Sequence, residues 1–450
     1  MKNLLPKKLI DLAENLSSPL YLVGGMVRDY LIDKSLSLDI DIASPIKVEE
    51  LSRVAKSVDI LVVGEYPRTG TAILYDGENK YEFTSFRKDV YSQGGKHAPD
   101  LTLPTDSILE DALRRDFKCN AVYFDIKKGE FVDPLGGIED IKNKTISTVK
   151  DATEVFSHDG LRLMRLARQS AELNFTPSEE TLLGATKNAD KIKDISVERI
   201  FVELTKILES DKKHSFSNPK GHYEGLKILD RTRVLDLILP ELTLGRNMPQ
   251  RADYHDYDVL EHSLRSVLYA PKEIRLAMLF HDVGKPYCMQ NFGEYHRHDL
   301  YGERIAKDIL NRLKVSNKQK EEVLFIARHH MLDLKREMRE VKVRRFIVKN
   351  YPFIPKLFLA KQADFSACKD DLSIAPTVER WQGIIEKMKE ENLPFSIKEL
   401  AVNGEDLIKA GVPQKQIGKT LQNLLDLVVG GEKQNEKQAL LSYINRKKEL

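Results

Sequence analysis

A pair of glycines between an apolar run and a helical pattern constrains this chain more than any other feature. Residues 21–23, Tyr-Leu-Val, form a short apolar run of strand type that ends at Gly24 and Gly25. Residues 26–32 follow with apolar side chains three and four apart, which is the spacing of a helix. The glycines therefore form a strand-to-helix turn, where backbone N–H groups can approach a phosphate closely and the helix N-terminus favours negative charge.

A second pattern follows, because residues 38–42 read Leu-Asp-Ile-Asp-Ile. On a strand, residues i and i+2 share a face, so Asp39 and Asp41 point the same way while the apolar residues point into a core. Two carboxylates this close repel each other unless a cation lies between them, and Mg²⁺ prefers oxygen ligands and phosphate partners. The two patterns together indicate metal-assisted nucleotidyl transfer, in which one metal activates the attacking oxygen and another holds the triphosphate.

Either pattern on its own has a simpler explanation, a solvated strand face for Asp-x-Asp and an ordinary turn for Gly-Gly. In this order and at this spacing they resemble the class II tRNA nucleotidyltransferases, a family that includes CCA-adding enzymes and bacterial poly(A) polymerases. Further motifs extend the resemblance over most of the chain. It implies that Asp39 and Asp41 hold Mg²⁺ at the catalytic centre and that Gly24, Gly25 and Arg28 bind the triphosphate.

The resemblance implies an α+β fold, with a mixed-sheet palm-type nucleotidyltransferase head followed by an all-helical neck, body and tail. The hydrophobic pattern agrees, since helical spacing continues from about residue 151. We expect the head at residues 1–145, the neck at 146–210, the body at 211–375 and a tRNA-binding tail at 376–450. Within the head the sequence predicts strands at 21–23, 38–43, 60–63, 71–75, 81–84, 121–125 and 131–132, and helices at 26–32, 48–57 and 107–114.

Two features of the head lie between its motifs. Glu82, in the predicted strand at 81–84, is a candidate third carboxylate near the metals, and an exposed strand residue is the equal alternative. Residues 88–106 are rich in Gly, Pro, Lys and Asp, which predicts a mobile loop. In the family a flexible loop at this position helps the pocket to switch between nucleotides, so its presence favours CCA or A addition over a CC-only enzyme.

A second motif, Arg-Arg-Asp-Phe-Lys-Cys-Asn-Ala, begins at residue 114. An arginine offers a planar fork of donors suited to phosphate, and Asp116 and Asn120 can hydrogen-bond a ribose. The alternative is a salt-bridged helix end. The order of residues resembles a second family signature, with Lys and Cys where relatives usually carry Thr and an aliphatic residue, and implies that Arg115, Asp116 and Asn120 bind the nucleotide.

The neck opens on a third motif, His-Asp-Gly-Leu-Arg. Asp159 and Arg162 are three residues apart, which predicts neighbours on one helix face, and an ordinary ion pair is the structural alternative. The segment resembles the family's Glu-Asp-x-x-Arg motif, in which Asp and Arg read the base edge of the incoming nucleotide, with His158 standing where relatives carry Glu. Arg165 and Arg168 continue the basic face and are expected to contact the triphosphate or the tRNA end.

A group of metal-binding residue types lies further along the chain. His281 and Asp282 belong to the run Ala-Met-Leu-Phe-His-Asp-Val-Gly-Lys, with His262 upstream and Asp364 downstream. Imidazole and carboxylate together suit a divalent transition metal, and the run resembles an HD-domain signature, which implies such a site and phosphoester hydrolysis. A lone histidine on a helix is more often structural. Three further histidines are candidate ligands of a second metal: His298, His329 and His330.

Composition limits the other classes of protein. The net charge of +2 means that any RNA surface must come from local clusters of charge. The three cysteines are far apart and form no Cys-x-x-Cys pair, which argues against a disulfide framework or a cysteine zinc site and fits a reducing cytoplasm. No stretch reaches about 18 apolar residues, so we expect neither a signal peptide nor a membrane span.

Two later segments are candidates for RNA contact. Residues 335–349 are strongly basic, which favours a solvated helix face over a track for tRNA phosphates. Residues 396–448 resemble the family's tail, which contacts tRNA through shape and backbone charge.

The sequence thus predicts a tRNA nucleotidyltransferase that adds C, C and A from CTP and ATP to the tRNA 3′ end without a nucleic-acid template. Its partners would be the tRNA 3′ end and acceptor arm, ATP and CTP, and no membrane. Its cofactors would be Mg²⁺ at the head and a divalent transition metal at the HD site. The alternatives are an A-adding enzyme or poly(A) polymerase on the same fold, or an HD-type phosphohydrolase with an RNA-binding head. The sequence specifies neither the oligomeric state nor the HD metal.

Overall fold

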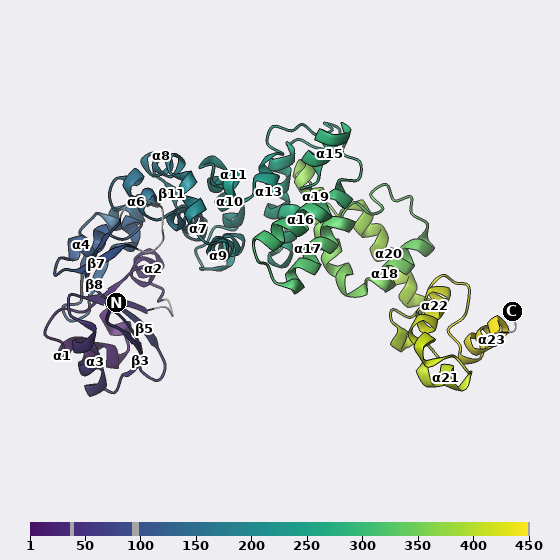
Figure 1. The fold of residues 1–450 in the computed structure, drawn as a ribbon, viewed down its shortest axis with the longest axis horizontal. Helices are drawn as coiled ribbons and strands as arrows, with labels where there is room; N and C mark the ends of the chain where they lie inside the picture. Colours follow the sequence, from purple (N-terminus) through teal and green to yellow (C-terminus); the bar gives the residue numbers. More distant parts are fainter. Residues whose placement is uncertain (37–39, 92–98, 449–450) are drawn as a thin grey trace. The chain divides into compact units, whose positions relative to one another are not determined.

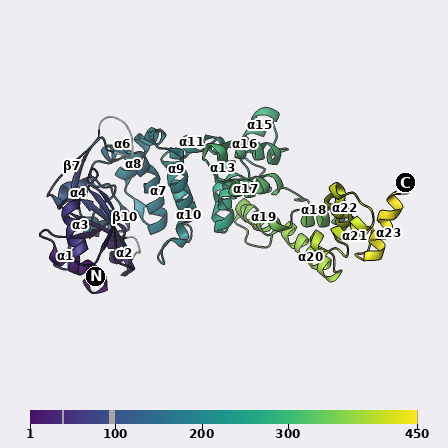
Figure 2. The ribbon, with the colours of Figure 1, turned by 60° about the horizontal axis from the view of Figure 1, so that its bottom comes forward.

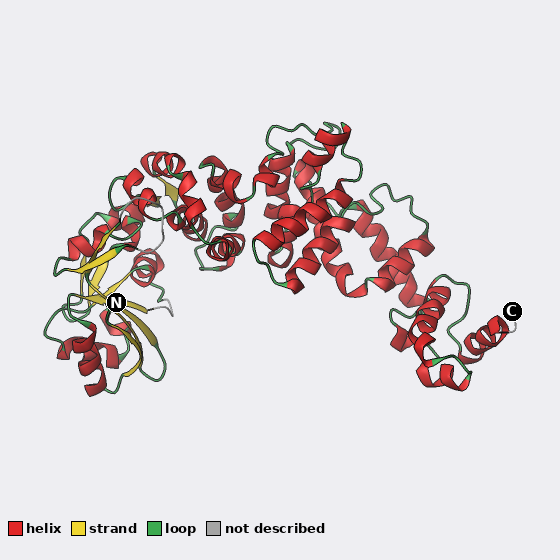
Figure 3. Ribbon diagram, viewed as in Figure 1, coloured by secondary structure: helices red, strands yellow, loops and turns green. Residues whose placement is uncertain are grey.

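The chain divides into two compact units, Met1–Pro240 and Glu241–Leu450. The computed structural model describes residues 1–36, 40–91 and 99–448. All strands among these residues belong to the first unit, while the second unit is built from helices (Figure 3). The predicted α+β class, with a mixed sheet before an all-helical remainder, is confirmed. The four finer divisions of the chain stay predictions.

A mixed sheet of seven strands forms the centre of the head. Its strand order is β3-β4-β5-β2-β1-β8-β9, with β2 and β5 parallel and the other neighbours antiparallel. The labelled strands β3, β5 and β8 lie in the purple and blue N-terminal part of Figure 1. The strands are β1 (Tyr21–Val23), β2 (Ile40–Ser44), β3 (Leu61–Tyr66), β4 (Thr71–Tyr75), β5 (Lys80–Ser85), β8 (Tyr123–Asp125) and β9 (Glu130–Val132).

The helices of the head follow from its apolar spacing. Helix α3 (Val48–Ser57) has the predicted bounds and buries Val48, Leu51 and Ala55 against β3 and β4, because positions three and four apart share a helix face. Helix α2 packs against β1 and β2 and begins at the paired glycines. The head helices are α1 (Lys7–Asn15), α2 (Gly25–Asp33), α3, α4 (Ile108–Leu113) and α5 (Gly137–Lys142).

The predicted strands of the head all occur, and only their ends differ. The predicted strand at 121–125 begins at Tyr123, because Lys118–Asn120 form a 3₁₀ turn in which the Ala121 N–H donates to the Lys118 carbonyl. Residues 38 and 39 of the predicted strand at 38–43 lie outside the described residues.

The prediction of a loop over residues 88–106 is wrong at both ends. Strands β6 (Arg87–Val90) and β7 (Leu101–Pro104) form an antiparallel ribbon in which Val90 pairs with Leu101. Composition did not reveal this ribbon, because its backbone pairs join residues that are separated along the chain by a polar segment. Residues 92–98 lie outside the described residues.

The neck consists of helices that pack on one another within the first unit. Helices α7, α9 and α10 are mutual neighbours (Figure 2). A short parallel pair, β10 (Thr145–Ile146) and β11 (Thr176–Pro177), joins the end of the head to the neck. The helices in the predicted neck range are α6 (Ala152–His158), α7 (Leu161–Leu173), α8 (Glu179–Lys187) and α9 (Val197–Leu208). Two helices of the range predicted as body also belong to the first unit, α10 (Gly221–Arg231) and α11 (Val234–Ile238).

The regular elements among the described residues of the second unit are all helices. None of the described helices of the chain is both long enough and apolar enough to cross a bilayer. The helices are α12 (Pro240–Thr243), α13 (Val259–Tyr269), α14 (Arg275–Phe280), α15 (Lys285–Phe292), α16 (His298–Arg312), α17 (Asn317–His329), α18 (Glu340–Lys349), α19 (Ile354–Lys369), α20 (Pro376–Glu390), α21 (Gly404–Lys409), α22 (Ile417–Val429) and α23 (Lys437–Lys448).

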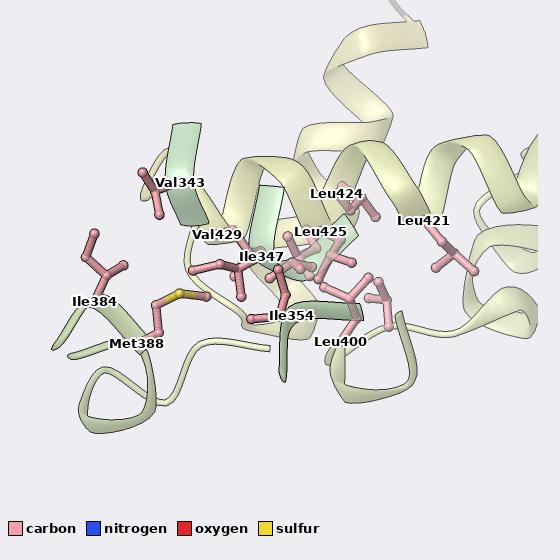
Figure 4. Packing of buried hydrophobic residues seen from close by; sticks show 14 of the residues in the cluster. Val343, Ile347, Ile354, Ile384, Met388, Leu400, Leu421, Leu424, Leu425 and Val429 are labelled. Atoms are coloured by element: carbon pink, nitrogen blue, oxygen red, sulfur yellow. The ribbon is translucent and has the colours of Figure 1, made fainter. Parts of the chain in front are cut away.

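One hydrophobic core joins α18, α20 and α22. It contains Ile347, Met388 and Leu425, which point toward one another in Figure 4. The core therefore continues across residue 376, where the sequence predicted a boundary between body and tail.

The basic stretch at 335–349 is not simply a solvated helix face. Arg344 on α18 is buried, with Nη1 donating to Glu391 Oε2 (2.5 Å) and Nε to Glu340 Oε1 (2.9 Å). Arg345 donates to Glu432 Oε1 at 2.5 Å. The other basic residues of the stretch, Lys335, Arg336, Arg339, Lys342 and Lys349, are exposed as predicted. Glu391 and Glu432 are distant in sequence, so local charge density did not reveal that Arg344 and Arg345 pair with them.

Candidate functional site

A cavity of about 1190 Å³ lies in the first unit and is lined by both head and neck. It brings together three motifs that are far apart in the chain. The nucleotide-binding and catalytic residues predicted from the sequence that line it are Gly24, Gly25, Arg28, Asp41, Arg115, Asp116, Asn120, Asp159, Arg162, Arg165 and Arg168. The sequence therefore predicted the composition of this wall, and their individual roles stay predictions.

The glycine turn and the acidic strand are adjacent in the cavity wall. Strand β1 pairs with β2 so that Leu22 faces Ile42, which places Asp41 beside the turn. Gly24 has φ +80°, and a Cβ built there would lie 3.0 Å from Asp41 Oδ2. A side chain at this position would be strained and would crowd the carboxylate, so glycine allows the acid and the phosphate-binding turn to meet.

The other two predicted acids of the head have different outcomes. Asp39 lies outside the described residues. Glu82 is in register with Asp41 on the neighbouring parallel strand, so both side chains point to one face of the sheet. Glu82 is exposed, lies 2.6 Å from Lys80 Nζ, and does not line the cavity. Its role as a third carboxylate stays a prediction.

Arg28 connects the glycine turn to the second motif. Its Nε and Nη2 donate to Asp29 Oδ1 at 2.8 and 2.7 Å, and its Nη1 donates to Asn120 Oδ1 at 2.8 Å. The Asn120 amide donates in turn to Asp116 Oδ1 (3.0 Å) and Gln169 Oε1 (2.8 Å). These groups are buried, so the network fixes the guanidinium before a nucleotide arrives.

Asp116 joins the second motif to the neck. Arg165 Nε donates to Asp116 Oδ2 at 2.7 Å. Burial by itself raises the pKa of Asp116, but the Arg165 charge and the hydrogen bond from Asn120 outweigh it and hold this pKa well below its usual value. The carboxylate is therefore ionised at neutral pH and holds the motif and the neck helix together.

The third motif differs from its prediction in one respect. Asp159 and Arg162 do not share a helix face, because Asp159 is an extended residue at the end of α6 (φ −146°) and Arg162 lies in the first turn of α7. The Asp159 carboxylate accepts from the Leu161 N–H at 2.9 Å, and its Oδ2 lies 3.8 Å from Arg162 Nε. The helical conformation is interrupted at Asp159, so the pair meets across the start of α7 while both residues still line the cavity.

Three residues that support the cavity were not predicted from the sequence. Glu203 on α9 accepts from Arg168 Nε at 2.6 Å and so holds this arginine from the neighbouring helix. Asp111 on α4 pairs with Arg115 (3.1 Å). Tyr91 stacks on His158 with ring centroids 4.7 Å apart. Only Glu203 could have been found from the sequence, because the segments of α7 and α9 both have the apolar spacing of amphipathic helices.

Comparison with known proteins agrees with the geometry. A family model described as poly A polymerase head domain matches residues 20–147, one described as the probable RNA and SrmB-binding site of polymerase A matches 174–244, and one described as tRNA nucleotidyltransferase domain 2 matches 300–444. The chain belongs to the class II tRNA nucleotidyltransferases.

Its relatives include curated CCA-adding enzymes. That of Anoxybacillus flavithermus is 27% identical over 95% of this chain and 94% of its own length. That of Geobacillus kaustophilus is 39% identical over 42% of this chain and 45% of its own length. The solved CCA-adding enzyme of Bacillus stearothermophilus in complex with CTP has a TM-score of 0.65 at 24% identity, over 98% of both chains, which shows a shared fold.

This nucleotidyltransferase also carries a buried histidine–aspartate cluster in its second unit. His262 on α13, His281 and Asp282 after α14, and Asp364 on α19 direct one ligand atom each to a common centre, all within 4.8 Å of one another. His262 Nε2 lies 3.0 Å from Asp364 Oδ1 and 3.3 Å from Asp282 Oδ2. His281 Nε2 lies 3.3 Å from His262 Nε2. The four residues predicted as metal ligands therefore meet.

A second set of ligand atoms meets on the other oxygen of Asp282. His298 Nε2 and His330 Nε2 lie 3.2 and 3.4 Å from Asp282 Oδ1, and 3.2 Å from each other. His329 does not join them, because its ring packs against Phe325, and burial lowers its pKa to about 4. Of the three additional histidines, the structure thus places His298 and His330 at the centre.

Backbone hydrogen bonds set the tautomers of three of these histidines. His281, His298 and His330 each direct Nδ1 at a carbonyl oxygen three residues earlier, at 2.7, 2.8 and 2.9 Å. A carbonyl only accepts, so Nδ1 carries the proton and Nε2 of a neutral ring has a free lone pair. Burial lowers the pKa of His281, but Asp282 and Asp364 outweigh it and raise this pKa to about 10. The centre therefore attracts positive charge, a proton or a metal ion.

Close packing requires the glycine of the His-Asp-Val-Gly-Lys motif, Gly284. A Cβ at Gly284 would lie 2.2 Å from the His298 carbonyl oxygen, so only glycine allows the start of α15 to lie against the start of α16. Lys285 donates to Gln250 Oε1 at 2.7 Å and lies 2.6 Å from Asp282 Oδ2. The remainder of the signature thus positions Asp282 and His298.

Proposed function

We propose that this nucleotidyltransferase adds C, C and A from CTP and ATP to the 3′ end of tRNA without a nucleic-acid template. The observation that supports it is one cavity with a phosphate-binding turn and Asp41 on one wall and the Asp159–Arg162 pair on another. An Asp acceptor and an Arg donor can hydrogen-bond the edges of C and A and mismatch those of G and U. The protein itself would then supply the template.

In the reaction, the terminal 3′-oxygen attacks the α-phosphorus, a new P–O bond forms, and pyrophosphate leaves. The N–H groups at Gly24 and Gly25 and the Arg28 guanidinium would hold the triphosphate so that its leaving oxygens are fixed. Carboxylate oxygen is the ligand type that Mg²⁺ prefers, and Asp41 beside the turn provides one. Asp39 and Asp41 would hold Mg²⁺, which supplies charge stabilisation and nucleophile activation when bound.

The product pattern tests this proposal against its close alternatives. Three tRNA substrates, ending before the first C, after one C and after both, are each offered CTP, ATP or both with Mg²⁺. We expect every substrate to be extended to a defined CCA end. Extension only of the substrate with both Cs, by one A, would identify an A-adding enzyme, and a long A-ladder would identify a poly(A) polymerase.

The histidine–aspartate cluster supports a second candidate function, phosphoester hydrolysis with a bound divalent transition metal. Imidazole lone pairs and buried carboxylates that face one centre are a donor set suited to such a metal. His262, His281, Asp282 and Asp364 would hold one ion, and His298 and His330 with the other oxygen of Asp282 would complete a second position. The metal would supply Lewis-acid polarisation of a phosphoryl oxygen.

Metal content of purified wild-type protein and the His281→Gln variant, determined by elemental analysis, checks this candidate. We expect the variant to lose the bound ion, because one ligand is removed. Its metal-dependent phosphatase activity should fall by about 10- to 100-fold or more. The matched control is His296→Gln, since His296 is exposed and only two residues from His298.

Wild-type protein with no bound transition metal after incubation with Zn²⁺, Mn²⁺, Co²⁺ or Ni²⁺ would contradict the candidate and leave the cluster as a buried ion-pair network. Chelation gives a second readout. We expect removal of a saturating metal to lower the free energy of unfolding of the second unit by about 3 kcal/mol or more, as for any ligand that binds only the native state.

A further inference from the structure

The arginines around the nucleotide cavity are already paired with carboxylates. Among the described residues, seven arginines line it. Each lies within 4.0 Å of an acidic oxygen of the protein, so their positive charges are largely balanced before a nucleotide binds. The pairs are Arg28–Asp29, Arg87–Asp89, Arg114–Asp111, Arg115–Asp111, Arg162–Asp159, Arg165–Asp116 and Arg168 with both Glu172 and Glu203.

A triphosphate brings several negative charges into this cavity. Paired guanidinium groups can still donate hydrogen bonds, but each pair contributes little net charge at a distance. A cation without an acidic partner contributes its full charge and needs no internal ion pair to break. Binding of a triphosphate therefore calls for at least one such cation in the wall.

Lys213 is such a cation. It lines the cavity and its side chain is exposed, and within the described part of the chain its ammonium group has no ion-pair or hydrogen-bond partner. It follows the 3₁₀ turn Ser210–Lys212, in the segment that joins α9 to α10. The segment lies at the start of residues 211–375, the range predicted as the body, and no function was predicted for it from the sequence.

The segment that carries Lys213 is anchored to the head. His214 Nδ1 lies 3.8 Å from Asp29 Oδ2, on the carboxylate that holds Arg28. Ser215 Oγ donates to Asp33 Oδ2 at 3.0 Å, so two successive residues attach the segment along α2. Ser217 Oγ donates to the Glu172 carbonyl at 3.0 Å on the neck helix α7. Lys213 is thus held beside the helix that begins at the phosphate-binding turn.

His214 contributes to this anchoring through packing and not through a charge of its own. Burial lowers its pKa, and Asp29 opposes that effect only in part. Its ring stacks on Phe216 with centroids 4.7 Å apart and planes 5° from parallel. The segment therefore has a defined local conformation next to a side chain that itself has no partner.

We propose that Lys213 binds the triphosphate of the incoming nucleotide and that His214 and Ser215 are positioning residues that hold it at the cavity. The inference rests on the proposed function, since it needs a nucleoside triphosphate in this cavity. A lysine ammonium is a compact charge with three donors and recognises phosphate without regard to the base. Its contribution is therefore the same for CTP and ATP, unlike that of Asp159 and Arg162.

Equilibrium binding of CTP and ATP, with CMP and AMP for comparison, tests the proposal on the full chain with Mg²⁺ and without tRNA. We expect Lys213→Ala to weaken the binding of both triphosphates by about tenfold, as for the loss of one charge-assisted contact. The monophosphates should change by less than about twofold, since they lack the distal phosphates. Lys213→Arg should restore most of the affinity.

The matched control is Lys212→Ala, because Lys212 is the adjacent exposed lysine and does not line the cavity. In steady-state incorporation, Lys213→Ala should raise the KM for CTP and ATP and leave kcat and the KM for tRNA near wild type. Ser215→Ala should give a smaller change of the same kind, about two- to threefold.

Two results would overturn the proposal. Equal effects of the Lys212 and Lys213 variants would show only a general electrostatic effect of the segment. A raised KM for tRNA at unchanged nucleotide affinity would assign Lys213 to the RNA instead. Failure of the proposed function is read separately, from wild-type protein that binds neither triphosphate or incorporates neither nucleotide.

Discussion

Replacement of Asp41 by asparagine reduces nucleotide incorporation by about 10³-fold or more, because a metal-binding carboxylate stabilises transition-state charge by several kcal/mol. The change keeps the shape of the side chain beside Gly24, where a larger group has no room. Nucleotide affinity should fall far less than kcat, since the glycine turn and Arg28 are untouched. The loss of activity is measured as the rate of incorporation of labelled CTP and ATP into tRNA at saturating Mg²⁺.

The matched control is Glu65→Gln, an exposed acid on β3, at the edge of the same sheet. It should retain wild-type activity. Glu82→Gln forms a third arm, because a large loss there would support the candidate third carboxylate beside Asp41. Wild-type turnover of the Asp41 variant would refute the assignment of this cavity as the catalytic centre.

Substitution at Arg162 has the second largest expected effect, on the choice of base. Arg162→Ala should reduce the preference for CTP and ATP over UTP and GTP by about 10- to 100-fold, the value of one well-placed hydrogen-bonding pair to a base edge. Asp159→Ala should act in the same direction, since the two side chains lie 3.8 Å apart and are proposed to bind one base edge together. The ratio of kcat/KM between correct and incorrect nucleotides is the quantity to measure.

The ratio separates base reading from structural damage. Arg162 also donates to the Arg114 carbonyl at 2.6 Å, so its loss is expected to lower stability and overall activity as well. A purely structural effect would lower kcat/KM for all four nucleotides alike. The control is Arg231→Ala, which removes an exposed pair with Glu179 on the neck surface. An unchanged ratio in both Arg162→Ala and Asp159→Ala would exclude the protein template.

The two proposed activities can be assigned to separate sites with variants already described. The cavity lies in the first unit and the histidine–aspartate cluster in the second. Asp41→Asn should therefore abolish incorporation and leave the amount of bound transition metal unchanged. His281→Gln should lose the transition metal and keep wild-type incorporation. A shared loss in either variant would contradict the assignment of two independent centres.

Helices and strands were predicted well where the signal lies in the spacing of neighbouring residues. Helix α3 has the predicted bounds, because its amphipathic spacing repeats over three turns. The Asp159–Arg162 pair shows the limit of such local prediction. The two residues are neighbours as predicted, but the helical conformation is interrupted at Asp159 and they meet across the start of α7. Strands β6 and β7 were missed because their pairing joins distant residues of unremarkable composition.

The sequence by itself determined which chemical groups this protein has and their order: the glycine turn, the aspartates, the arginine-rich motifs and the histidine–aspartate signature. The tertiary structure alone decided which groups meet. It joined Arg28 to Asn120 across 92 residues, selected His330 over its neighbour His329, and left Lys213 without an acidic partner among the residues that the structure describes. The physical reason is that local spacing fixes the face of a helix or strand, while packing of distant elements fixes which faces touch.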